Sequence, residues 1–156
     1  LLNKGVADEL QAVHQYMYFH FHLDNQGFGP LSALFRRVAI QEMLHIEQLA
    51  ERILFLKGDV NMVPAGPVER VTDAEKILKR AAEMEHEAVG IYNQSAIQSG
   101  QNADAVSKQI FEALVADEER HFDEFDKQLD NIKRFGLSYL ALQSFTAAPP
   151  GPAPQA

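Results

Sequence analysis

The chain has 156 residues, 46% of them hydrophobic, and a formal net charge of −8 at pH 7. This length suits one domain with a sizeable core, and the acidic balance argues against nucleic acid as the main partner, because phosphate binding needs a basic face. The absence of cysteine excludes disulfides, thiolate-held iron–sulfur clusters and a cysteine nucleophile. No apolar run approaches the ~18 residues of a membrane span and no signal peptide is visible, so we expect a cytoplasmic protein with no membrane partner.

Prolines and glycines divide the chain into five predicted helices. The second helix is expected to stop at Gly58, and Thr72 with Glu75 reads as a capping box that opens the third. Gly136 separates the fourth helix from a short fifth one. The predicted helices cover about residues 2–25, 31–57, 72–100, 103–134 and 137–145.

The connections between these helices predict the topology. Short turns join the first helix to the second and the third to the fourth, so each pair should be antiparallel. The connection at 59–71 is long enough to cross the length of a bundle. We therefore predict an all-α, ferritin-like four-helix bundle with one long crossover and a short fifth helix, as a single domain over residues 1–145. Residues 146–156 form a Pro/Ala-rich tail.

The two halves of the chain carry the same potential metal ligands at the same spacing. In each half a lone Glu is followed 33 positions later by a Glu-x-x-His. Neighbouring residues repeat too, since Tyr16 and Tyr92 each lie seven positions after the lone Glu. Residues three apart on a helix share a face, so each Glu and its His should point the same way. The six residues are Glu9, Glu42, His45, Glu85, Glu118 and His121.

This ligand set predicts a catalytic two-metal site. Carboxylates are hard donors suited to iron and manganese, and imidazole holds a divalent ion. Two divalent ions would neutralise four carboxylates, which could not all ionise together in an empty, buried site. Structural zinc is disfavoured, because it prefers closed four-coordinate sites of Cys and His. The arrangement is that of ferritin-like di-iron and di-manganese proteins.

A second apolar stripe predicts that the chain self-associates. On the first helix Leu10, Met17 and Phe21 lie about one residue around from the stripe that carries Glu9. The second helix repeats the pattern with a flanking surface. That surface comprises Ala39, Ile40, Met43, Ile46 and Ala50.

At these residues the chain resembles bacterioferritin, and the resemblance covers nearly its whole length. The end of the second helix, residues 51–58, is also similar. The resemblance implies that Glu42 and Glu118 bridge two irons, with the other four residues as terminal ligands. It further implies iron storage and detoxification by a hollow shell of twenty-four identical subunits, built from two-fold dimers. Such a shell oxidises Fe(II) with O₂ or H₂O₂, as a ferroxidase, and stores the ferric mineral.

The resemblance also assigns roles to residues outside the ligand set. Met43 matches the axial ligand of a haem iron shared by two subunits, although periodicity alone favours an interface Met. Tyr16 matches a Tyr beside the di-iron centre, but it could equally be a core residue. Some relatives carry an extra iron site on the inner surface, which Arg37 and Gln41 put in doubt here. Candidates for the porphyrin pocket are Leu10, Val13, His14 and Met17.

Three other functions remain open on the sequence. A di-iron peroxidase of the rubrerythrin type would carry a Cys-rich module, and this chain has no Cys. A miniferritin places its oxidation site between subunits and needs no Glu-x-x-His in each half. A non-enzymatic haem-binding scaffold would leave the six-residue set unexplained.

Overall fold

The structure, a computed structural model, describes residues 1–146, and over that range it holds helices and no strand. This confirms the predicted all-α class. The predicted tail lies outside the described residues except for Thr146. The helices are α1 (Leu2–Asn25), α2 (Gly29–Phe55), α3 (Ala74–Gln101), α4 (Ala105–Phe135) and α5 (Leu137–Phe145).

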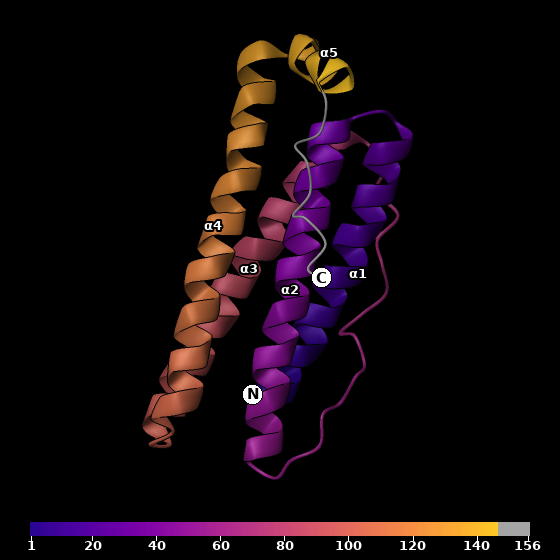
Figure 1. Cartoon of the computed structure of the whole chain (residues 1–156). Helices are drawn as coiled ribbons and strands as arrows, with labels where there is room; N and C mark the ends of the chain where they lie inside the picture. The colour runs from indigo at the N-terminus through magenta and orange to yellow at the C-terminus, as the bar shows by residue number, and fades with distance from the viewer. Residues whose placement is uncertain (147–156) are drawn as a thin grey trace, which may run out of the picture.

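Four long helices form the bundle as two antiparallel pairs (Figure 1). α1 packs along α2, and α3 packs along α4. The extended connection between α2 and α3 runs the length of the bundle along its outside, and α5 lies across one end. The single crossover agrees with the prediction from loop lengths. Because it returns the chain to the other end of the bundle, α3 runs in the same direction as α2.

The N-terminal cap of α3 differs from the predicted capping box. Asp73, not Thr72, is the capping residue, and its side chain accepts a hydrogen bond from the Lys76 backbone N–H. Asp104 caps α4 in the same way, accepting from Ser107. Both side chains satisfy a backbone donor that the first helical turn leaves free, and their negative charge suits the helix N-terminus.

The C-terminal end of α2 also departs from the prediction. Lys57, and not Gly58, adopts the left-handed conformation, with φ of 63°. The Lys57 N–H donates to Leu54 and the Gly58 N–H to Ile53, which is a Schellman motif displaced by one residue. A Cβ on residue 58 would lie 3.1 Å from Ile53 Cγ2, a tight contact that the Ile53 side chain would have to relieve by shifting slightly.

The apolar core consists of two clusters at the two ends of the bundle. One contains Tyr16 with Phe19, Phe35 and Phe125, and Phe35 stacks on Phe125 at 4.9 Å between ring centroids. The other contains Tyr92 with its stacked neighbour Phe111, among other side chains. The two clusters leave the middle of the bundle to polar residues.

Two glutamines on α1 fasten the crossover to the bundle. Gln11 accepts a hydrogen bond from the Gly66 N–H and donates one to the Pro67 carbonyl. Gln15, which is 1% exposed, makes the same pair of bonds with the N–H and carbonyl of Glu69. Each side-chain amide therefore substitutes for a backbone partner that this irregular segment lacks.

The predicted second stripe is only partly on the surface. Phe21 is 60% exposed and Met43 46% exposed. Ala39 and Ile46, however, are buried within their own subunit, because α1 packs over this part of α2. The face available to another subunit is therefore narrower than the sequence pattern suggested. Within residues 1–146, no helix is long and apolar enough to cross a membrane.

Candidate metal centre

The six predicted ligands meet in the middle of the bundle, between the two apolar clusters. All are at most 2% exposed. The Glu-x-x-His spacing places each Glu and its His on the inward face of one helix. α1 contributes Glu9, α2 contributes Glu42 and His45, α3 contributes Glu85, and α4 contributes Glu118 and His121.

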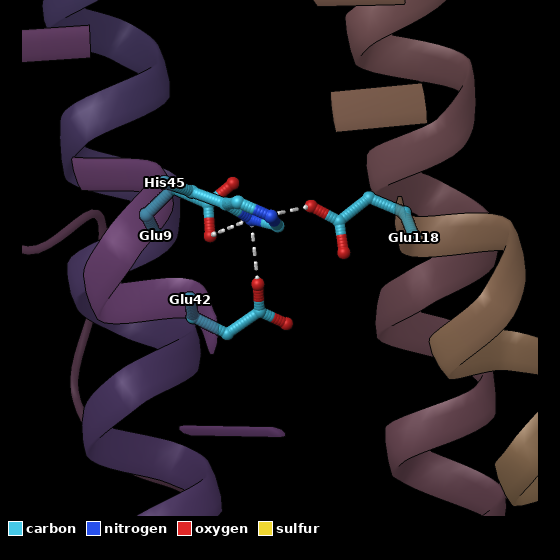
Figure 2. Close-up of side chains that lie close together, drawn as sticks. All are labelled: Glu9, Glu42, His45 and Glu118. Atoms are coloured by element: carbon cyan, nitrogen blue, oxygen red, sulfur yellow. Dashed lines mark ion pairs between the residues drawn. The ribbon is translucent and has the colours of Figure 1, made fainter. Parts of the chain in front are cut away.

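The first group of donors surrounds the His45 ring (Figure 2). His45 Nδ1 lies 2.9 Å from Glu42 Oε2, 3.2 Å from Glu118 Oε1 and 3.6 Å from Glu9 Oε2. Figure 2 shows Glu9, Glu42 and His45 pointing from α1 and α2 towards Glu118 on the opposite pair. The four residues offer one donor atom each within 4.8 Å of one another, which is the size of a single-ion site.

The second group repeats this geometry around His121. His121 Nδ1 lies 3.1 Å from Glu42 Oε1, 3.1 Å from Glu118 Oε2 and 3.8 Å from Glu85 Oε2. Glu42 and Glu118 thus belong to both groups and turn one oxygen towards each histidine, whereas Glu85 belongs to this group alone. The two imidazole rings are 6.0 Å apart. This is the geometry of two adjoining positions joined by two carboxylates.

Three buried atoms of the first group lie close together but make no hydrogen bond of normal geometry. They are Glu42 Oε2, His45 Nδ1 and Glu118 Oε1. Buried polar atoms without a partner are costly, and these three face one another. A divalent cation between them would satisfy all three at once, so the residues fit a metal site.

The carboxylates cannot all be ionised without a cation. Burial, then the neighbouring Glu42, raises the pKa of both Glu9 and Glu85. Burial would also raise the pKa of Glu118, but contacts with His121 and His45 outweigh it and lower that pKa to about 2. The cation-free site therefore holds protons that two divalent ions would displace.

The carboxylates act on the histidines in the opposite direction. Burial alone would lower the pKa of His121, but Glu118 and Glu42 raise it to about 9. The pKa of His45 is raised further than that of His121. Burial of the ring would lower it, but Glu118, Glu42 and Glu9 together outweigh burial. In the cation-free site both imidazoles therefore keep a second proton, which a bound metal would replace.

Each histidine is oriented by a residue from the opposite helix. His45 Nε2 lies 3.0 Å from Asp117 Oδ2, and His121 Nε2 lies 2.9 Å from Gln41 Oε1. Both partners accept, so each ring carries a proton on Nε2, and its Nδ1 faces the carboxylates with a second proton in the cation-free site or offers its lone pair to a bound metal. Gln41 and Asp117 each precede a ligand Glu in the sequence, and their matching places in the repeat were visible there.

Two tyrosines hold the remaining carboxylates. Tyr16 donates a hydrogen bond to Glu85 Oε1, and Tyr92 donates one to Glu9 Oε1. The sequence singled out Tyr16, and the structure does place it against a predicted ligand. Tyr92 was not singled out, although it occupies the equivalent position in the second repeat.

The other histidines lie outside the cluster. His14 and His86 are exposed, and His20 bonds to Ser32 through Nδ1. Arg37, at a position that the resemblance links to the extra iron site of some relatives, forms an ion pair with Glu124 on α4. Met43 is on the surface, one residue from Glu42 but turned away from the centre.

A cavity of about 220 Å³ reaches the centre from the surface between α1 and α3. Its inner wall includes carboxylates of the site, and both tyrosines line it. Nearer the surface it is lined by Asp8, Gln11, Arg80 and Glu87. Arg80 contacts Glu69 at 2.9 Å and Glu87 at 3.5 Å. The cavity therefore connects exposed side chains with the carboxylates of the candidate metal centre.

Comparison with known proteins agrees with this geometry. Residues 1–135 match the family described as Ferritin-like domain. The chain is 33% identical to a bacterioferritin of Desulfovibrio desulfuricans over 153 residues, which is 98% of this chain and 86% of that one. It is 34% identical to a bacterioferritin of Rhodobacter capsulatus, covering 95% of this chain and 91% of that one. The chain belongs to the bacterioferritin family.

A solved bacterioferritin superposes on nearly the whole chain. The X-ray structure of the Desulfovibrio desulfuricans bacterioferritin matches with a TM-score of 0.94 and 33% identity, covering 99% of this chain and 91% of that one. That structure describes a diiron site in different catalytic states. The match confirms the bacterioferritin resemblance and the four-helix bundle with a short fifth helix.

Proposed function

We propose that this bacterioferritin stores and detoxifies iron, oxidising Fe(II) at the six-residue centre. The observation that carries the proposal is the sharing of Glu42 and Glu118 between two donor groups. One oxygen of each carboxylate faces each histidine, as expected of ligands that bridge two ions. Glu9 and Glu85 serve one group each, as terminal ligands would.

The residues would act mainly by holding two Fe(II) ions together. Each Fe(II) gives up one electron, so two ions can reduce O₂ to H₂O₂, or H₂O₂ to two waters, with uptake of two protons in either case. The shared carboxylates keep the two ions adjacent, and the tyrosines fix the terminal carboxylates. Four carboxylates balance two divalent ions and stabilise the greater charge of the ferric product.

We also propose that Met43 ligates a haem iron shared by two subunits. Its side chain is 46% exposed, so it is free to meet the same residue of a second chain across a two-fold axis. Thioether sulfur is a soft ligand that suits haem iron. The position next to Glu42 agrees with the family resemblance.

The proposed storage function needs a closed shell, for which we infer twenty-four copies of the chain assembled from two-fold dimers in the cytoplasm. Exposed apolar side chains support such assembly. They include Phe21 on α1, which is 60% exposed, and Leu137 and Phe145 on α5, which are 83% and 87% exposed. The native mass tests this point directly.

Rapid mixing of metal-free protein with Fe(II) and either O₂ or H₂O₂ tests the oxidation. We expect a fast rise in ferric absorbance that saturates at two Fe(II) per chain, followed by slower mineral growth when more iron is added. Prior addition of Zn(II) should abolish the fast phase, because it occupies the same donors. Oxidation no faster than in buffer would contradict the proposal.

A further inference from the structure

The two halves of the centre differ at one pair of equivalent positions. His45 is backed by Asp117, a carboxylate, and His121 by Gln41, an amide. The two distances are nearly equal, 3.0 Å and 2.9 Å, and each partner comes from the residue before the bridging Glu on the opposite helix. Geometry is therefore matched while charge is not.

A carboxylate behind an imidazole makes the ring a stronger ligand. It attracts the Nε2 proton, pushes electron density towards Nδ1 and adds a negative charge near the metal position. A neutral amide orients the ring equally well but adds no charge. Changing such a partner typically alters metal affinity by about 10–100-fold.

The rest of the charge around Asp117 reduces this difference without removing it. Arg120 forms an ion pair with the other oxygen, Asp117 Oδ1. The Arg120 side chain is 62% exposed, so solvent screens its charge, whereas the His45 side chain is 2% exposed. The negative charge of Asp117 therefore acts on a buried ring, whereas the positive charge of Arg120 is partly screened by solvent.

We propose that the two metal positions are unequal, and that the group of Glu9, Glu42, His45 and Glu118 fills first because Asp117 supports its histidine. This rests on the proposed function, in that both positions are taken to bind divalent metal. Asp117 and Gln41 are positioning residues and do not contact the ion. The three buried donor atoms that make no hydrogen bond of normal geometry all belong to this first group, which agrees with its being the tighter position.

Calorimetric titration of metal-free protein with Co(II), which does not turn over with O₂, tests the inequality. We expect two steps of one Co(II) per chain, with dissociation constants about 10-fold or more apart. The isosteric change Asp117→Asn should weaken the first step by about 10-fold and bring the two constants together. Gln41→Glu, equally isosteric, should instead tighten the second step and leave the first unchanged.

The two variants act in opposite directions, so a general loss of structure in either cannot imitate the result. The inequality is overturned by one class of two equal sites in the parent protein, by Asp117→Asn acting on the weaker step, or by an unchanged second step in Gln41→Glu. A total below two Co(II) per chain would contradict the proposed function itself. The variant Glu42→Ala with Glu118→Ala gives the blank for ions bound elsewhere.

Discussion

The hydroxyl of Tyr16 on α1 donates a hydrogen bond to Glu85 on α3, and not to Glu9 on its own helix. Tyr92 on α3 makes the reciprocal bond to Glu9. The two bonds cross between the helix pairs and hold both terminal carboxylates. Burial, followed by the adjacent carboxylate, raises the pKa of each tyrosine, so both phenols stay protonated and remain donors over the working pH range.

Replacing either tyrosine by Phe should destabilise the metal-free protein. Loss of the hydroxyl leaves a buried carboxyl oxygen without its donor, which costs about 1–3 kcal/mol, so Tyr16→Phe and Tyr92→Phe should each lower the free energy of unfolding by about that much. Urea denaturation measures it. Tyr18→Phe is the matched control, because Tyr18 is only partly buried and its hydroxyl makes no hydrogen bond to a described residue. Equal losses for all three variants would show that the crossed bonds contribute nothing.

The stability of the metal-free protein should fall as pH rises from about 5 to 9. Glu9 and Glu85 have pKa values raised above 4.5, so the folded state holds protons that the unfolded chain releases once pH exceeds that value. The pKa of His121 rises from 6.5 to about 9, so its contribution is complete below 6.5 and is lost as pH passes 9.

Glu118 has the opposite sign. Its lowered pKa, about 2, contributes stability above pH 4.5 that disappears as pH falls through 2. Maximum stability is therefore expected near pH 5. Urea midpoints of the metal-free protein between pH 4 and 9 check this, beside the Zn(II)-loaded protein, whose dependence on pH should be weaker. A metal-free protein more stable at pH 9 than at pH 6 would contradict it.

Glu118→Ala should remove the fast phase of Fe(II) oxidation, because it deletes one of the two carboxylates shared by both groups. His86→Ala is the control, since His86 follows Glu85 but its side chain is exposed and outside the cluster. It should oxidise Fe(II) at the parent rate. Initial rates from rapid mixing give the comparison, and parent rates in both variants would place the reaction elsewhere.

Met43→Leu should abolish haem binding and leave iron oxidation largely intact. Leu is close to Met in volume, and the side chain lies outside the subunit core, so folding should be little affected. The absorption spectrum of the protein reconstituted with haem measures the first property, and Fe(II) oxidation the second. A retained low-spin spectrum with two Met ligands would rule out Met43.

The sequence predicted the helices and the ligand set well because both depend on local spacing. It missed details where two neighbouring residues could serve equally, as Thr72 and Asp73 both can as helix caps. It also missed Lys57, because lysine seldom adopts the left-handed conformation, which the usual preference assigns to the neighbouring Gly58.

The pairings across the centre were beyond local reasoning. Repetition in the sequence showed that Gln41 is equivalent to Asp117, and Tyr16 to Tyr92. Which carboxylate or imidazole each one contacts depends on how far the helices are rotated about their axes in the bundle. Packing of both apolar clusters decides that rotation, and no spacing within one helix encodes it.

The hydrogen bonds from Gln11 and Gln15 to the connection between α2 and α3 should make the amide hydrogens of this irregular segment exchange slowly. The N–H groups of Gly66 and Glu69 are bound by side chains of α1, and the N–H of Ala65 by the Ala7 carbonyl. Their exchange requires the segment to detach from the helix, so hydrogen–deuterium exchange should find them protected while exposed loop amides equilibrate at once. In Gln15→Ala protection should be lost at Glu69 first, and the segment should become the preferred site of cleavage by added protease.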